Sequence, residues 1–176
     1  MNGPVVECVP NFSEGEDRER IEAIVAAMRV DGVHLLDWSM DAAQNRSVVT
    51  IAGQPGAVVE AAVRAVGRAV ELIDLTRQRG LHPRIGAADV IPFVPISGIK
   101  LDQCAMLARQ AGLEIWRRLA SRCFFMKRQP PVLTGPTWTT CATANSRGCA
   151  RQCARILRGI PTWAVPICIR RLAPAR

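Results

Sequence analysis

The sequence predicts an α+β fold whose antiparallel sheet is built in the order β-α-β-β-α-β, the ferredoxin-like split βαβ arrangement. Short apolar segments rich in Val, Ile and Thr alternate with longer segments of helical periodicity. A third helical segment follows the last predicted strand, and the regular pattern ends near Leu119. We therefore expect one α+β domain over residues 1–119 and an irregular tail over residues 120–176.

The first part of this domain predicts a strand, a helix and a second strand. Residues 5–9 form a short apolar run typical of a buried strand. Ser13 and Glu16 have capping-box spacing, which predicts the start of a helix. Apolar residues then recur at helical spacing on one face, at Ile21, Ile24, Val25 and Met28. A turn signal at residues 31–32 precedes a predicted strand over residues 33–38.

The second part predicts two more strands and two more helices. Residues 46–52 are rich in Val, Thr and Ile, which favours a third strand. Pro55 suits the first turn of a helix that ends before Gly80. The apolar stripe of this helix is Val58, Ala62, Ala65, Val66, Ala69 and Ile73. Residues 90–94 predict the fourth strand. The stripe of a helix over residues 102–119 is Leu107, Ala108, Ala111, Ile115 and Leu119. We expect the helices to cover one face of the sheet and the other face to remain open.

The composition argues against a membrane protein and against a secreted disulfide scaffold. Of the 176 residues, 49% are hydrophobic, so a sizeable core can form. No apolar run approaches the length of a membrane span, and the first residues lack the pattern of a signal peptide. Seven Cys is an odd number without framework spacing. These features predict a cytoplasmic protein that does not act at a membrane.

Charge is distributed unevenly between the domain and the tail. Residues 1–119 hold all 15 acidic residues and 13 Lys or Arg, whereas residues 120–176 hold 10 Lys or Arg and no acid. Five of the seven Cys also lie in the tail, together with prolines that break any long helix. The tail therefore predicts an irregular, basic segment rich in Arg, Cys and Pro.

The loop that contains His82 is the most informative local segment. Pro83 fixes its own φ and favours an extended conformation at His82, while Gly80 and Gly86 permit turns on either side. An imidazole held on a rigid loop can act as a general base near neutral pH. Arg84 adds a permanently charged group that can bind a carboxylate through two hydrogen bonds.

Three segments together resemble a known family. They are residues 5–15 (VVECVPNFSEG), residues 41–48, and residues 80–87 (GLHPRIGA). In this order and at this spacing they resemble the N-terminal subdomain of the glutamate formimidoyltransferases, over about the first two thirds of the chain. Three ordered motifs are more specific than any single one.

The resemblance implies transfer of a formimino group from N-formiminoglutamate to N5 of tetrahydrofolate, in histidine degradation and one-carbon metabolism. Tetrahydrofolate is then a co-substrate, and no metal is implied. His82 aligns with the catalytic His of the family. Further residues are expected to bind substrate: Asp37 or Asp41 to orient the imidazole or stabilise a cation, Arg46 and Arg84 to hold a carboxylate, and Asn11, Ser13 and Asn45 to supply neutral hydrogen bonds.

Structural interpretations of these residues stay open at the level of sequence. Asn11 and Ser13 are also common in caps and turns, and Asp37 and Asp41 are common in turns. Arg46 begins a predicted strand and could be a solvated edge charge. His34 lies outside the motifs and is interpreted as structural, and Cys8 and Cys104 as small core residues.

The family resemblance also implies a second, similar subdomain, whose folate-contacting loop is absent from these 176 residues. We therefore expect impaired transferase activity from this chain. Shifted by one base after Leu119, codons for the tail can encode GIPVFLYE and then a string typical of the family. This predicts that the tail is an out-of-frame translation caused by a one-base deletion near Leu119 and Ala120.

Other classes of function compete with this interpretation. The basic tail, with Trp138 and Trp163, could bind single-stranded RNA, although it lacks a recognition motif. Cys149 and Cys153, with Cys141 and Cys168, could form a zinc site, although the second closely spaced pair is missing. A non-catalytic fragment that forms a homo-oligomer through apolar surface is a further alternative.

Overall fold

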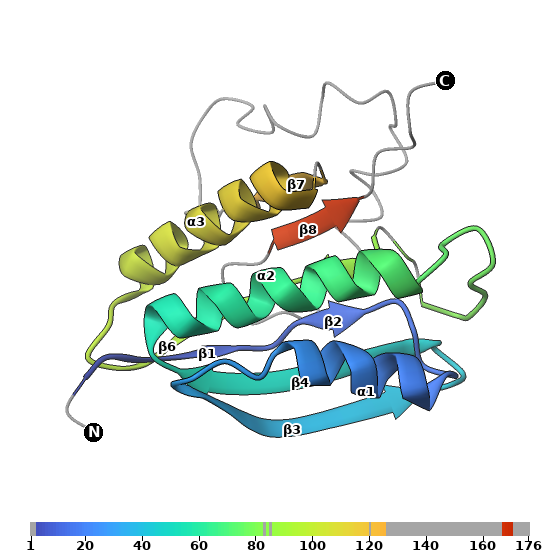
Figure 1. The fold of residues 1–176 in the computed structure, drawn as a ribbon, viewed down its shortest axis with the longest axis horizontal. Helices are drawn as coiled ribbons and strands as arrows, with labels where there is room; N and C mark the ends of the chain where they lie inside the picture. Colours follow the sequence, from blue (N-terminus) through green and yellow to red (C-terminus); the bar gives the residue numbers. More distant parts are fainter. Residues whose placement is uncertain (1–2, 83, 85, 120, 126–166, 171–176) are drawn as a thin grey trace, which may run out of the picture.

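A computed structural model describes residues 3–82, 84, 86–119, 121–125 and 167–170 (Figure 1). The elements, in chain order, are β1 (Val5–Cys8), β2 (Asn11–Phe12), α1 (Arg18–Ala27), β3 (Val33–Asp41), β4 (Arg46–Gly53), α2 (Pro55–Leu72), β5 (Ala88–Val90), β6 (Phe93–Ser97), α3 (Leu101–Leu119), β7 (Arg122–Phe125) and β8 (Ile167–Arg170). The described strand pairs are all antiparallel, which confirms the α+β class and the antiparallel sheet.

The strand predicted over residues 90–94 is interrupted in the structure, and a short strand that was not predicted, β2, follows β1. The main sheet has the order β5-β2-β4-β1-β6, with β3 paired to the other side of β4. Pro10 separates β1 from β2 and Pro92 separates β5 from β6, because proline has no N–H to donate to a ladder. Their carbonyl oxygens still accept hydrogen bonds, Pro10 from Val49 N at 3.0 Å and Pro92 from Val9 N at 3.3 Å. The interruptions therefore change the direction of the strands without ending the sheet.

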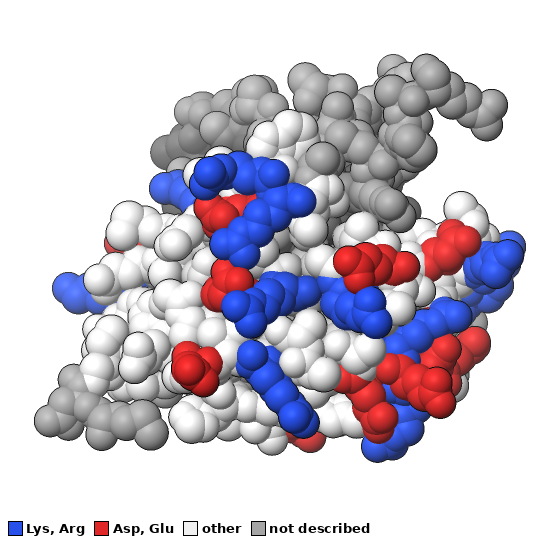
Figure 2. Space-filling model, in the orientation of Figure 1, with Lys and Arg blue, Asp and Glu red and all other residues white. Residues whose placement is uncertain are grey.

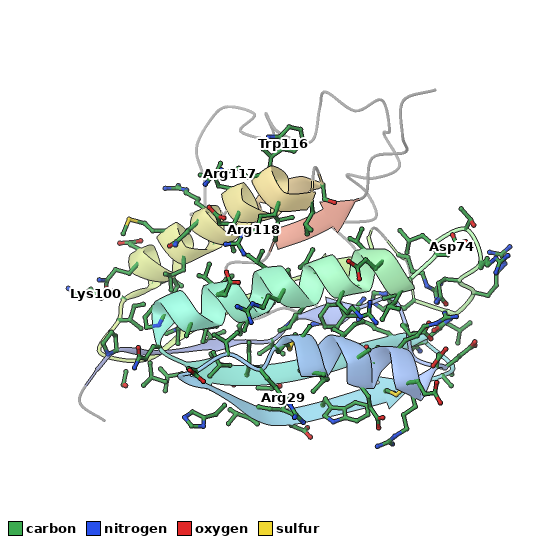
Figure 3. All side chains as sticks on the ribbon, in the orientation of Figure 1. Arg29, Asp74, Lys100, Trp116, Arg117 and Arg118 are labelled. Atoms are coloured by element: carbon green, nitrogen blue, oxygen red, sulfur yellow. The ribbon has the colours of Figure 1, made fainter. Side chains whose placement is uncertain are left out.

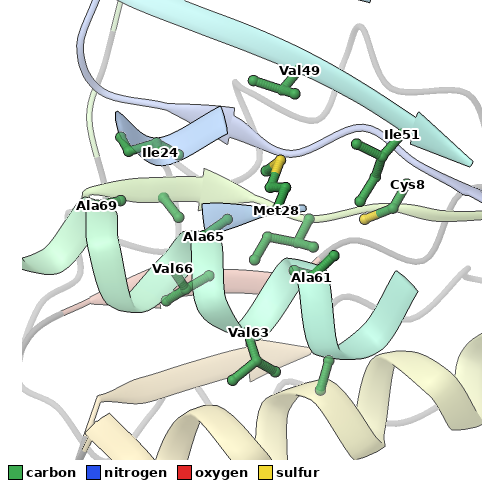
Figure 4. Packing of buried hydrophobic residues seen from close by; sticks show 14 of the residues in the cluster. Cys8, Ile24, Met28, Val49, Ile51, Ala61, Val63, Ala65, Val66 and Ala69 are labelled. Atoms are coloured by element: carbon green, nitrogen blue, oxygen red, sulfur yellow. The ribbon is translucent and has the colours of Figure 1, made fainter. Parts of the chain in front are cut away.

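Burial alternates along the central strands, so the sheet has one buried and one open face. Val6 and Cys8 of β1 and Val49 and Ile51 of β4 are fully buried, whereas their neighbours in each strand are half-exposed. The buried residues contact the apolar faces of α1 and α2 (Figure 4). Burial raises the pKa of the Cys8 thiol and that of the Cys104 thiol, which suits their predicted role as small core residues.

The predicted helices are present, but the first begins later than its capping-box pattern indicated. Asp17 is the N-cap of α1, and its carboxylate accepts a hydrogen bond from Arg20 N. Ser13 is fully buried and bonds to a distant loop instead of to the helix. The capping-box prediction was therefore wrong because a tertiary contact competes for the Ser13 hydroxyl.

Helix α2 lies between the strands of the main sheet and α3 in Figure 1, and it packs against both α1 and α3. Its outer side carries an ion-pair network in which Arg118 of α3 bonds Glu60 of α2 at 2.8 Å and Glu114 at 2.9 Å. Figure 2 shows positive and negative side chains interspersed over this face. Trp116 projects from α3 away from α2 in Figure 3 and is 51% exposed.

The tail departs in part from the expected irregular structure. The two segments of it that the structure describes are the strands β7 and β8, which pair with each other. Both are rich in residues that favour strands, such as Phe124 and Ile169. The remaining tail residues, including Cys141, Cys149, Cys153, Trp138 and Trp163, lie outside the described residues.

The packing predicts that the two faces of β4 differ in their contribution to stability. Ile51→Ala should lower the free energy of unfolding by about 2–5 kcal/mol, because it leaves a cavity in the core. Val48→Ala, on the open face of the same strand, should cost less than half of that. Urea unfolding of the two variants measures the difference, and equal losses would contradict the assignment of faces.

Candidate functional site

A cluster of polar side chains lies where the loop of residues 79–87 crosses the ends of three strands. Asn11 comes from β2, Arg46 begins β4, and Asp89 is the central residue of β5. His82 reaches this cluster from the loop. Asn11 and Phe12 pair with Val48 and Ser47 of β4 on one side and with β5 on the other, so the sheet register brings these side chains together.

Arg46 is the centre of the cluster. Its Nε and Nη2 atoms donate hydrogen bonds to Asn11 Oδ1 at 3.1 and 2.9 Å. Its Nη1 atom donates to Asp89 Oδ2 at 2.9 Å, and the side chain is only 13% exposed. The guanidinium is therefore held in place by two partners on neighbouring strands, which is the planar recognition that arginine favours.

His82 is half-buried and lies against the same guanidinium. Arg46 Nη1 is 2.8 Å from Nδ1 and 3.2 Å from Nε2 of the ring. Both ring nitrogens thus lie within hydrogen-bond distance of one guanidinium nitrogen, and Nδ1 is the nearer of the two. Arginine has donors only, so this contact suits a neutral imidazole, the form that can accept a proton.

Asp89 connects this cluster to the far end of the His82 loop. The carboxylate is buried, with its side chain 1% exposed. Oδ1 accepts from Gly86 N at 3.0 Å, while Oδ2 accepts from Ser13 Oγ at 3.2 Å as well as from Arg46. Ser13 Oγ also lies 2.8 Å from the Gly86 carbonyl oxygen, and Ser13 N donates to Ala87 O at 2.9 Å. Buried carboxylates of this kind require charged and hydrogen-bonding partners, and Asp89 has both.

The electrostatics of Arg46 reflect its buried position. Burial lowers the pKa of the Arg46 guanidinium, the charge of Asp89 opposes this effect, and the nearby Arg84 lowers the pKa further. Arginine stays protonated at neutral pH despite such shifts. The cluster thus holds two cations, Arg46 and Arg84, and one buried carboxylate, which makes it favourable for an anionic ligand.

Arg84 fixes the loop through longer contacts than those of Arg46. Its guanidinium donates to the carbonyl oxygens of Gln44 at 3.2 Å and of His82 at 3.4 Å. A Cβ at Gly80 would lie 2.3 Å from Arg84 Nη2 and 2.6 Å from the Gln44 carbonyl, so only glycine allows this approach. The Arg84 contacts are near the limit of hydrogen bonding, so exchanging one for a carboxylate would cost little.

A second buried network supports the loop from the other side. Asn45 adopts a left-handed conformation at φ 48° and accepts a hydrogen bond from Gly15 N at 2.7 Å. Its amide donates to Gln78 Oε1 at 2.5 Å and to Arg79 O at 2.7 Å. Gln78 in turn donates to the buried carboxylate of Glu14 at 2.7 Å. This network connects the residues that follow β2, the turn at residues 41–46 and the start of the His82 loop.

The structure brings most of the sequence-predicted site residues together and separates one of them. Asn11, Ser13, Arg46 and His82 belong to one cluster, while Asn45 is buried and acts as its support. Asp41 Oδ1 accepts from Gln44 N at 3.0 Å, which is the turn interpretation of that residue. Asp37 is opposite Thr50 on the exposed strand β3, four residues from the Asp41–Arg46 pair, or roughly 13 Å along the strand.

Sequence reasoning missed Asp89 and Glu14. Both are acidic residues that become fully buried, at 1% exposure each, although acidic residues are rarely buried without partners. Asp89 follows Ala87 and Ala88 and precedes two apolar residues. A lone acid inside an apolar strand pattern is a signal that could have identified it.

The described residues contain no group of three or more His, Cys, Asp or Glu that could hold a metal ion. Within the same part of the chain, no helix has the length and apolar character needed to cross a membrane. The site offers two guanidinium groups, neutral donors and an imidazole, and its buried carboxylate is already paired with Arg46, which suits an anionic organic ligand.

A family comparison agrees with this geometry. The family described as the formiminotransferase domain, N-terminal subdomain, matches residues 5–131, which includes every element of the main sheet and all three helices. The chain belongs to this family. The match continues past Leu119 into the tail.

Individual proteins of the formiminotransferase family are also similar in sequence to this chain. The chain is 48% identical to the glutamate formimidoyltransferase of Thermoplasma acidophilum over 116 residues, 65% of this chain and 38% of that protein. It is 46% identical to the glutamate formimidoyltransferase of Streptococcus pyogenes serotype M1 over 121 residues, 68% of this chain and 40% of that protein. The formimidoyltransferase-cyclodeaminase of Rattus norvegicus is 45% identical over 116 residues, 21% of its length. The matched region is thus about two fifths of the shorter relatives.

The supporting network predicts a specific dependence of stability on pH. Burial by itself would raise the pKa of Glu14, but hydrogen bonds from the backbone of Asp17 and Glu16 and from Gln78 and Arg20 lower it below the usual value. A lowered folded-state pKa stabilises the fold above the unfolded pKa, about 4.3 for Glu. This contribution is lost as the pH falls through the folded-state value.

Glu14→Gln should therefore lower the free energy of unfolding at pH 7 and flatten its decline between about pH 5 and pH 3. Urea unfolding across this range measures both effects. Glu22→Gln is the matched control, because Glu22 pairs with Arg18 on the surface, at 51% exposure, where such pairs contribute little. Parallel pH profiles for the Glu14 variant and the wild type would contradict the assignment.

Proposed function

We propose that this chain supplies the His82 site of a transferase that moves the formimino group of N-formiminoglutamate to N5 of tetrahydrofolate. The observation that supports this most strongly is the fixed contact between His82 and Arg46, at 2.8 Å, within a chain of the formiminotransferase family. Two relatives are named glutamate formimidoyltransferase. Tetrahydrofolate then serves as co-substrate, and the partners of the chain are small molecules.

The chemistry assigned to His82 is general-base catalysis. The amine at N5 attacks the amidine carbon and loses a proton, which a neutral imidazole can accept. The bond from that carbon to the amino nitrogen of glutamate then breaks, and the protonated imidazole can return the proton to the departing glutamate. The ring meets this requirement because its contact with Arg46 suits the neutral form. Rigid positioning of the base relative to the substrates supplies much of the rate in such a bimolecular reaction.

The carboxylates of the substrate are assigned to Arg84, with Arg46 as part of the supporting structure. Arg46 already bonds Asn11 and Asp89, whereas the Arg84 contacts to backbone carbonyls are 3.2 Å or longer. A bidentate bond to a carboxylate is stronger than these neutral contacts. Asn11 and the exposed Asp41 lie at the edge of the same cluster, where neutral or cationic parts of the substrates could bond.

We also propose that the main sheet and its helices form a ferredoxin-like fold. If β1 with β2 and β5 with β6 are each counted as one interrupted strand, four antiparallel strands remain. Their spatial order places β3 at one edge, then β4, then β1 with β2, and β6 with β5 at the other edge. This is the order of a ferredoxin-like sheet with α1 and α2 as its two connecting helices. We assign residues 1–119 to this domain.

The activity of residues 1–176 as a separate protein is proposed to be low. The matched region is 38% of the Thermoplasma acidophilum relative, and the resemblance to the family implies two similar subdomains with the substrates between them. A site that holds only one side of two substrates loses much of the advantage of positioning. Cytoplasmic location follows from the same proposal, since both substrates are soluble metabolites.

A chimeric transferase tests the assignment of His82. Residues 5–119 of this chain replace the matched segment of the Thermoplasma acidophilum relative, and formimino transfer to tetrahydrofolate is measured. We expect activity in the chimera, and His82→Asn should lower kcat by about 10²- to 10⁴-fold with a small change in KM. The control is His34→Asn, since His34 is exposed on β3. A folded chimera whose His82→Asn variant retains full kcat would refute the role, with circular dichroism as the test of folding.

Resequencing of the gene tests the proposal on the tail. We expect an additional base near the codons for Leu119 and Ala120, after which the frame reads GIPVFLYE. This outcome would give a longer chain that continues the family pattern. An unchanged sequence on both strands would overturn the out-of-frame proposal and would make residues 120–176 a genuine part of the protein.

A further inference from the structure

One buried carboxylate, Asp89, contacts both the loop that carries His82 and the guanidinium that lies against the His82 ring. Its Oδ1 atom accepts from Gly86 N at 3.0 Å, and its Oδ2 atom accepts from Arg46 Nη1 at 2.9 Å. The same Nη1 atom is 2.8 Å from His82 Nδ1. Asp89 thus contacts the backbone of Gly86, which follows His82 in the loop, and also the Arg46 guanidinium that lies beside the His82 ring.

Ser13 completes this arrangement from β2. Its hydroxyl lies 3.2 Å from Asp89 Oδ2 and 2.8 Å from the Gly86 carbonyl oxygen, and it is fully buried. A fully buried Ser13 is not placed to contact a substrate. Its contacts are instead those of a residue that holds the carboxylate and the loop together, which explains why the hydroxyl is directed away from helix α1.

We infer that Asp89 is a positioning residue, which neutralises Arg46 and orients it so that the guanidinium holds the His82 ring, with Ser13 holding the carboxylate in turn. The inference rests on the proposed function for its catalytic meaning, because it concerns the same imidazole. Independently of catalysis, the balance between the Arg46 cation and the Asp89 anion sets the electrostatic environment of His82.

Four charged groups lie on the loop of His82 or on the strands beside it. Arg46 comes from β4, Asp89 from β5 and Arg84 from the loop itself. Asp41 is opposite Arg46 at the end of β3 and is exposed. Asp89 is the buried anion among these four, so removing its charge takes away the carboxylate that is paired with Arg46.

Titration of the two histidines of the chain by NMR tests the inference in the 176-residue protein. His82 reports on the site, and His34, exposed on β3, is an internal reference. Asp89→Asn keeps an acceptor for Gly86 N and removes the charge, so the midpoint of the His82 titration should fall by about half a pH unit or more. Arg46→Gln should move the midpoint the opposite way, and the double variant should lie close to the wild type.

Opposite shifts distinguish a charge-coupled positioning role from a purely structural one, since general loosening of the loop would move both variants toward the value of a solvent-exposed histidine. Asp31→Asn, at an exposed turn, is the matched control and should change neither histidine. Unchanged His82 signals in a folded Asp89→Asn variant, or shifts of the same sign in both variants, would overturn the inference. Should Asp89→Asn fail to fold, Ser13→Ala and Arg46→Gln still test it, with a small and a large shift expected.

This readout separates the inference from the proposed function. If the chimera shows that His82 is dispensable while the titration shifts have opposite signs, then the positioning network exists but serves another purpose. If His82→Asn inactivates the chimera and the titration does not respond to Asp89, then the function stands and this inference fails.

Discussion

The ion pair between Arg46 and Asp89 is the interaction on which the geometry of the site depends. It joins the first residue of β4 to the middle of β5, two strands that do not pair with each other and are held apart by β2. Removing one partner of a buried pair typically costs about 3–5 kcal/mol, because it leaves an uncompensated charge. Replacing both partners of a buried pair by apolar residues is often tolerated. The Arg46–Asp89 pair is therefore better explained by the geometry that it gives the site than by its contribution to stability.

That position is needed because His82 lies on a loop and not on a regular element. A loop has few backbone hydrogen bonds of its own, so its conformation must be determined by contacts with the rigid sheet. Here the contacts come from three directions: Asp89 and Ser13 hold Gly86, Arg46 lies against the ring, and Asn45 holds the carbonyl of Arg79. The exposed Leu81, at 80%, shows that the adjacent side chain is not part of this packing.

The sequence allowed the regular elements to be predicted, because their signals are local. The stripe of α2 became buried as expected, and β4 lies within one residue of its predicted range. The boundaries that failed have tertiary causes. β3 continues to Asp41 because Ser39, Met40 and Asp41 find partners on β4, although their own β propensity is low. Ser13 does not cap α1 for the same kind of reason, because its hydroxyl bonds the Gly86 carbonyl oxygen instead.

The candidate site could be predicted in part. Motif resemblance identified His82, Arg46 and Asn11, which the structure brings into contact. It could not show that Arg46 and Asn11 lie side by side on the open face of the sheet, since this follows from register, which pairs Arg46 with Asp41 and aligns Asn11 with Val48. Asp89 carries no motif of its own, and its partners, Ser13 and Arg46, are 76 and 43 residues away in sequence.

The two interrupted strands explain why a site forms at this end of the sheet. A regular strand pair would direct alternate side chains to opposite faces and would keep Asn11 and Asp89 in fixed ladders. Near the breaks at Pro10 and Pro92, the register shifts between Asn11 and Phe12, where β2 pairs with β5. Irregularities of this kind redirect side chains next to functional sites. This offset leaves Asp89 between the paired residues Ala88 and Val90, and its carboxylate bonds both Arg46 and the backbone of the His82 loop.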